Sequence, residues 1–70
     1  MERKNIDSSM LQSIGYDANS STLELEFKNG GVWQYFDLPE SLWYEFEAAE
    51  SQGKFFLREI KNQYPESRVE

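Results

Sequence analysis

Aromatic and basic side chains at regular spacing supply the chemistry that this sequence offers. Two aromatic residues stand two positions apart in an alternating segment. Three basic residues follow at the i, i+4 and i+7 positions of an expected helix, beside a further aromatic residue. Aromatic rings stack on nucleobases and cations contact phosphates, so this combination is typical of surfaces that bind nucleic acid. The candidate nucleic-acid-binding residues are Trp33, Tyr35, Lys54, Phe55, Arg58 and Lys61.

These residues also have a purely structural interpretation. Neighbouring aromatic residues stabilise small sheets, and basic stripes are common on solvent-exposed helices. The charge balance opposes phosphate binding, because 13 Asp and Glu residues outnumber 7 Lys and Arg residues and give a net charge of −6. Two hypotheses stay open: a weak site for RNA, either tRNA or single-stranded, and a protein-interaction or self-association surface that uses Trp33 and Tyr35.

The absence of histidine and cysteine limits the catalytic chemistry. It excludes Ser-His-Asp and Cys-His sites, thiol redox motifs and Cys/His zinc sites. Glu24 and Glu26 would share one strand face with no cleft between them, and the segment that begins at Asp17 lacks the glycine and the final glutamate of a calcium loop. We therefore expect no enzymatic activity, no metal or other cofactor and no small-molecule substrate.

The N-terminal residues carry charge with no apolar run behind them. No stretch approaches the roughly 20 apolar residues of a membrane span. The sequence therefore predicts no signal peptide, no membrane association and a cytoplasmic protein.

The period of the apolar residues changes once along the chain, from two to about 3.6. Alternation predicts strands over residues 10–16, 22–28 and 31–38, and helical spacing predicts amphipathic helices over 40–50 and 54–63. We expect an α+β domain at 8–64, a three-stranded antiparallel meander followed by two helices packed on one face. Residues 1–7 read as a polar lead-in and 65–70 as a C-terminal tail. The second helix should bury a stripe of Phe56, Leu57, Ile60 and Tyr64.

The turn at Asn29 and Gly30 determines which face the candidate aromatic residues occupy. A two-residue turn would pair Phe27 with Val32 and place Trp33 and Tyr35 on the open face of the sheet. A three-residue turn with a bulge would instead direct both rings into the core. The sequence alone leaves both registers open.

Several short motifs in order make the chain resemble the KTSC domain family over residues 8–64. This family is named for the C-terminus of some lysyl-tRNA synthetases and also occurs as small stand-alone bacterial proteins. The resemblance implies no established activity, and RNA as a suggested partner. In the family's Tyr-x-Tyr motif Trp33 replaces the first tyrosine, and Leu57 stands where the family more often has a polar residue, commonly asparagine. The matching motifs are Ser8-Ser9, Ile14-Gly15-Tyr16-Asp17, Trp33-Gln34-Tyr35, Leu38-Pro39 and Ser51-x-Gly53-Lys54-Phe55-Phe56.

Overall fold

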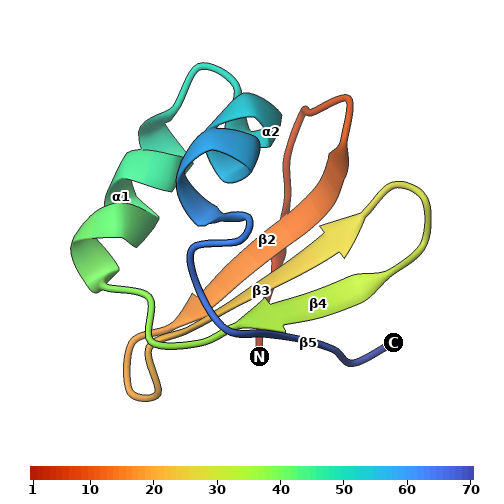
Figure 1. The fold of residues 1–70 in the computed structure, drawn as a ribbon. Helices are drawn as coiled ribbons and strands as arrows, with labels where there is room; N and C mark the ends of the chain where they lie inside the picture. Colours follow the sequence, from red (N-terminus) through yellow and green to blue (C-terminus); the bar gives the residue numbers. More distant parts are fainter.

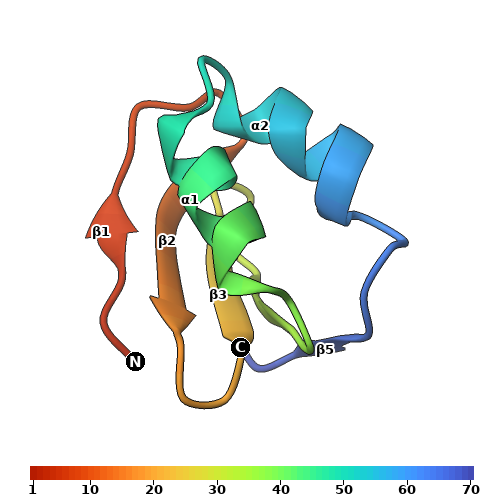
Figure 2. The ribbon, with the colours of Figure 1, turned by 90° about the vertical axis from the view of Figure 1, so that its left-hand side faces the viewer.

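Five strands form one antiparallel sheet, and the helices cover one of its faces (Figures 1 and 2). The computed structural model describes residues 1–70. The spatial order of the strands follows their order in the chain. The strands are β1 (Lys4–Asn5), β2 (Leu11–Asp17), β3 (Thr22–Phe27), β4 (Val32–Tyr35) and β5 (Glu66–Arg68), and the helices are α1 (Glu40–Ala48), α2 (Gln52–Phe55) and the π-helical turn η1 (Phe56–Ile60). The expected α+β class and the helices on one face are confirmed.

The prediction of a three-stranded sheet is wrong, because each end of the chain adds an edge strand. Strand β1 lies within the expected lead-in and β5 within the expected tail. All five of their residues are exposed, so neither strand has an apolar alternation that a sequence pattern would detect. Backbone hydrogen bonds hold them instead; the Val69 amide, for example, donates to the Val32 carbonyl at 2.8 Å.

The β3–β4 hairpin has the three-residue turn, and the register that follows from a two-residue turn is wrong. The Phe27 amide donates to the Gly31 carbonyl at 2.8 Å, and Gly30 has a φ of 108°. A glycine in this region accommodates the additional residue of a bulged turn. Leu25 therefore pairs with Trp33, and Leu23 with Tyr35. Both rings point to the helix-covered face, where they add apolar area to the core.

The core lies between this face of the sheet and the helices. Phe46 of α1 is fully buried, and its ring centroid lies 5.6 Å from that of Phe55. No helix is long and apolar enough to cross a membrane. Ten buried side chains form the main cluster: Leu11, Ile14, Leu23, Leu25, Tyr35, Leu38, Phe46, Phe55, Phe56 and Ile60.

The second helical segment is oriented differently from the prediction. Phe55 and Phe56 are both buried, so the next residue, Leu57, turns outward and is 48% exposed. The helix begins at Gln52, after Ser51 accepts a hydrogen bond from the Lys54 amide. It ends in a π turn, in which the Lys61 amide donates to the Phe56 carbonyl at 2.8 Å. The predicted buried stripe is therefore wrong at Leu57.

Candidate functional site

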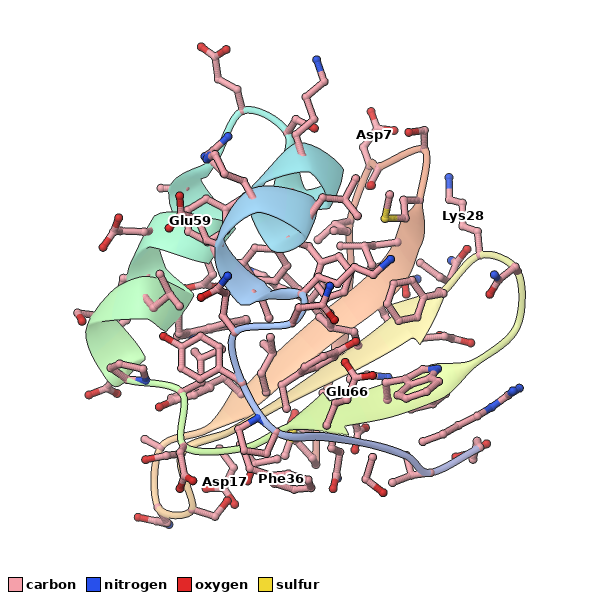
Figure 3. The ribbon with its side chains drawn as sticks, in the orientation of Figure 1. Asp7, Asp17, Lys28, Phe36, Glu59 and Glu66 are labelled. Carbon is pink, nitrogen blue, oxygen red and sulfur yellow. The ribbon has the colours of Figure 1, made fainter.

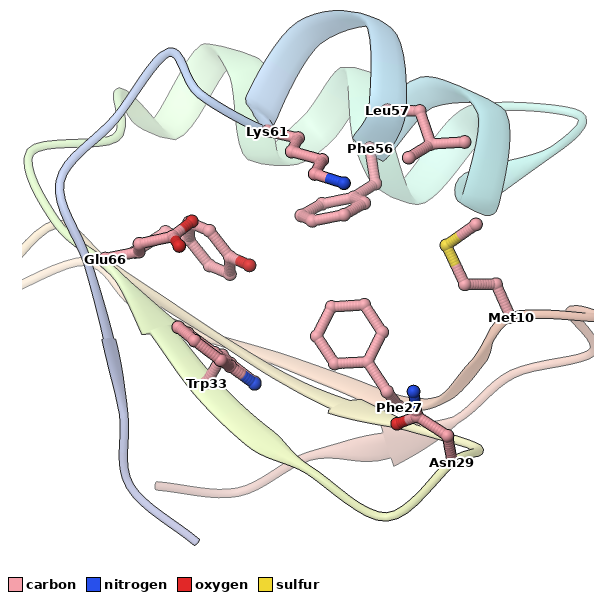
Figure 4. A pocket seen from close by; sticks show the side chains of 9 residues that line it. Met10, Phe27, Asn29, Trp33, Phe56, Leu57, Lys61 and Glu66 are labelled. Atoms are coloured by element: carbon pink, nitrogen blue, oxygen red, sulfur yellow. The ribbon is translucent and has the colours of Figure 1, made fainter.

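A groove opens between η1 and the β4–β5 side of the sheet (Figure 4). Its volume is about 480 Å³, which lies within the range of ligand-binding pockets. Three polar side chains contribute to its lining: Asn29, Lys61 and Glu66. Six apolar or aromatic side chains form the rest, and we call the whole surface the aromatic groove: Met10, Phe27, Trp33, Tyr35, Phe56 and Leu57.

The rings of the aromatic groove are held in place by edge-to-face packing. The centroid of Phe56 lies 5.4 Å from that of Phe27 and 5.5 Å from that of Tyr35. Trp33 is only partly buried and packs against the edge of the core. Because its neighbours are fixed by the core, Trp33 presents a ring in a defined position to the groove.

The polar side chains of the aromatic groove have no partners within the chain. Lys61 and Glu66 both point into the groove in Figure 4. Neither forms an ion pair, although each lines the same surface. A cation and a carboxylate are thus available beside exposed aromatic surface, as in sites where a few polar groups orient a ligand.

The Tyr35 hydroxyl stays protonated in the folded protein over an unusually wide pH range. Burial, and after it the negative charge of Glu66, raises the pKa of Tyr35 to about 12. The ordinary value is 10.0, and the residue is 3% exposed. The hydroxyl is therefore a neutral hydrogen-bonding group at the base of the groove.

This pKa predicts a loss of stability at alkaline pH. Between pH 10 and 12 the unfolded chain releases the Tyr35 proton and the folded chain retains it, so the free energy of unfolding falls as pH rises. We expect a total loss of about 3 kcal/mol from this group, which begins near pH 10 and is complete above about pH 12. Urea denaturation of the wild type and Tyr35→Phe across this range measures it. If the free energy of unfolding fell equally with pH in the two proteins, the raised pKa of Tyr35 would be contradicted.

The structure separates the six candidate residues. Trp33, Tyr35 and Lys61 meet at the aromatic groove. Lys54, Phe55 and Arg58 instead line a second hollow, of about 530 Å³, between α1 and α2 that also carries two glutamates.

On this second surface, Phe55 and Arg58 already interact with other parts of the chain. Phe55 is 6% exposed, and the Arg58 guanidinium lies 5.6 Å from its ring centroid. Arg58 also donates from Nε to Glu59 Oε2 at 3.0 Å. Phe55 therefore has no free ring face for a ligand, and part of the charge of Arg58 is already neutralised.

Two groove-side residues had no signal in the sequence. Glu66 and Arg68 lie in the segment expected to be a tail, and both are exposed. Strand β5 pairs Glu66 with Tyr35 and Arg68 with Trp33. Since paired residues point to the same face of a sheet, this pairing brings a carboxylate and a guanidinium beside the candidate rings.

The sheet face away from the helices carries a polar network at its centre. Arg3 forms an ion pair with Glu24 and donates from Nε to Ser13 Oγ at 3.0 Å. Ser13 Oγ donates to Glu26 Oε1 at 2.9 Å, and Gln34 Nε2 donates to Glu24 Oε1 at 2.8 Å. The charged side chains at the centre of this face are therefore already paired within the chain.

Comparisons with known proteins agree on one family. The KTSC domain model matches residues 7–64. The crystal structure of a KTSC domain protein from Yersinia pestis is 35% identical, with a TM-score of 0.96 and coverage of 99% of this chain and 97% of that one. A relative from Stutzerimonas stutzeri, described as an uncharacterized protein, is 34% identical over 64 residues, which cover 91% of this chain and 90% of the relative.

The family also occurs as part of much larger proteins. A lysine–tRNA ligase from Nostoc sp. is 33% identical over 58 residues, which cover 83% of this chain. The match spans only 10% of the ligase, so it concerns a small part of that enzyme.

Proposed function

We propose, because this chain belongs to the KTSC domain family and carries an open aromatic groove, that it is a non-catalytic module that binds single-stranded RNA weakly. The observation that carries the proposal is the partly exposed Trp33 ring beside the unpaired Lys61 ammonium. A ring face accepts an unstacked base, and the ammonium contacts a neighbouring phosphate. The presence of this domain in proteins named lysine–tRNA ligase favours RNA as the class of partner.

Local charge supports the proposal, although the whole chain is acidic. Lys61 lies on the groove, Arg68 pairs with Trp33 across β4 and β5, and Lys28 lies at the tip of the β3–β4 hairpin (Figure 3). The net charge of −6 repels phosphate at longer range. We therefore expect weak binding that depends strongly on salt, as few cations contribute.

The test compares two lysines that differ in position and not in charge. Lys61→Ala should weaken binding of a mixed-sequence RNA pentamer about three- to tenfold at low salt and lower the salt slope by about 0.7. Lys54→Ala removes the same charge from the other surface and should change affinity less than about twofold. NMR titration of labelled protein, with bulk tRNA as a second probe, measures both. Equal losses of affinity in the two variants would show that the aromatic groove is not the RNA-binding site.

Trp33→Leu provides a second measurement that separates stacking from charge. Leucine keeps apolar bulk against the core but offers no ring, so affinity should fall by about tenfold or more. A thermal melt of this variant shows whether the fold is retained. Unchanged affinity in a folded Trp33→Leu protein would show that no base stacks there.

A protein partner is the second candidate, and Leu57 is the observation that favours it. Its side chain is 48% exposed at the rim of the groove, next to Met10, and would contact an apolar side chain of another protein or a second copy. Such binding would persist at high salt, in contrast to phosphate contacts. A flat RNA titration at low salt would remove RNA and favour this alternative.

A further inference from the structure

Glu66 is a carboxylate in a groove proposed to bind an anionic polymer. Its side chain projects into the groove in Figure 4, and it forms no ion pair with Lys61 or with any other residue. A carboxylate only accepts hydrogen bonds at neutral pH. Its counterpart in a bound nucleotide must therefore be a donor, and in RNA the strong donors on a base are ring N–H and exocyclic amine groups.

The sheet pairing aligns Glu66 with the stacking platform. Glu66 is opposite Tyr35, and Arg68 is opposite Trp33, so both charged side chains are on the groove side of β5. Residues two apart on a strand lie about 7 Å from each other. A base stacked on Trp33 would thus lie within reach of Glu66 and Lys61, which line the same groove, and Arg68, whose Nε donates to the Glu70 carbonyl, lies beside Trp33.

The four bases differ in what they present to a carboxylate. Guanine has a ring N–H and an exocyclic amine side by side, and it alone donates two hydrogen bonds to the two oxygens. Adenine and cytosine offer a single amine on this edge. Uracil has one ring N–H between two carbonyl oxygens that a carboxylate repels.

We infer that the aromatic groove selects guanine, with Glu66 accepting two hydrogen bonds from the Watson–Crick edge of a base that stacks on Trp33. This inference rests on the proposed function and adds the identity of the base. It also explains why a carboxylate without an ion-pair partner lies in the groove. If the groove contacted only phosphate, the negative charge of Glu66 would weaken binding.

The test uses four RNA pentamers that differ only in the central base, which is G, A, C or U between uridines. The wild type should bind the G pentamer about tenfold tighter than the U pentamer, with A and C between them. Glu66→Gln should reduce the ratio of these two affinities to about two or less, since one amide oxygen replaces two carboxylate oxygens. NMR titration at low salt measures each affinity.

Glu59→Gln is the matched control for this substitution. It makes the same change in net charge at an exposed residue outside the groove (Figure 3). The G to U ratio should equal that of the wild type. A wild type that binds all four pentamers equally, or a Glu66→Gln variant that keeps the tenfold ratio, would overturn guanine selection and leave the RNA site in place. Failure of every pentamer to bind would overturn the proposed function itself.

Discussion

Replacing Phe56 with alanine should lower the free energy of unfolding by about 3–5 kcal/mol, a large share of the stability of this domain. Phe56 is 3% exposed, and its ring packs edge-to-face on both Phe27 and Tyr35. Removing it leaves a cavity between η1 and the sheet that these fixed neighbours fill only in part. A chain of this length has roughly 4–10 kcal/mol in total. Urea denaturation followed by circular dichroism measures the loss, and the variant should be partly unfolded at 37 °C.

Leu57→Ala is the control for this prediction. Leu57 is the next residue on η1, but its side chain is 48% exposed. Truncating it should cost less than about 1 kcal/mol, because little apolar surface leaves the core. Equal losses at the two positions would contradict the orientation of η1 and with it the wall of the aromatic groove.

Replacing Arg3 with alanine should lower the free energy of unfolding by about 2–3 kcal/mol. The side chain of its partner Glu24 is 11% exposed, and the Arg3 side chain is 24% exposed. Without the guanidinium, Glu24 keeps only the hydrogen bond from Gln34, and Ser13 Oγ loses its donor. The expected loss is below that of a fully buried pair because water reaches part of the guanidinium.

Lys4→Ala is the matched control, one residue further along the same segment. Lys4 Nζ lies 2.6 Å from Glu47 Oε2, but the Lys4 side chain is 58% exposed. An exposed pair of this kind contributes about 0–1 kcal/mol. The midpoints of thermal and urea denaturation should therefore be clearly lower for Arg3→Ala than for Lys4→Ala. If Arg3→Ala were as stable as Lys4→Ala, the network on the outer face would contribute no net stability.

The local parts of the fold were predictable from the sequence. Alternation predicted a strand over residues 22–28 and helical spacing predicted an amphipathic helix over 40–50, and the structure has β3 and α1 there, with Leu23, Leu25 and Phe46 buried. These patterns work because each element must bury one face, and the period of its apolar residues records which one.

The register of the β3–β4 hairpin was not predictable in this way. The difference between a two-residue and a three-residue turn is a single residue at Gly30, yet it moves every side chain of β4 to the other face. The side chains of Trp33 and Tyr35 each combine a large apolar ring with a polar atom. Both side chains are therefore compatible with either the buried or the exposed face of the sheet. Packing against Phe56 in the folded protein decides in favour of the helix side.

By itself, the sequence determined the α+β class, the family and the presence of aromatic and basic groups without histidine or cysteine. Only the tertiary structure decided which of these groups meet. Lys61 joins Trp33 while Lys54 does not, because the buried Phe55 and Phe56 orient the second helical segment. Glu66 reaches the groove because an exposed strand is held by backbone hydrogen bonds alone, and those leave no pattern in the sequence.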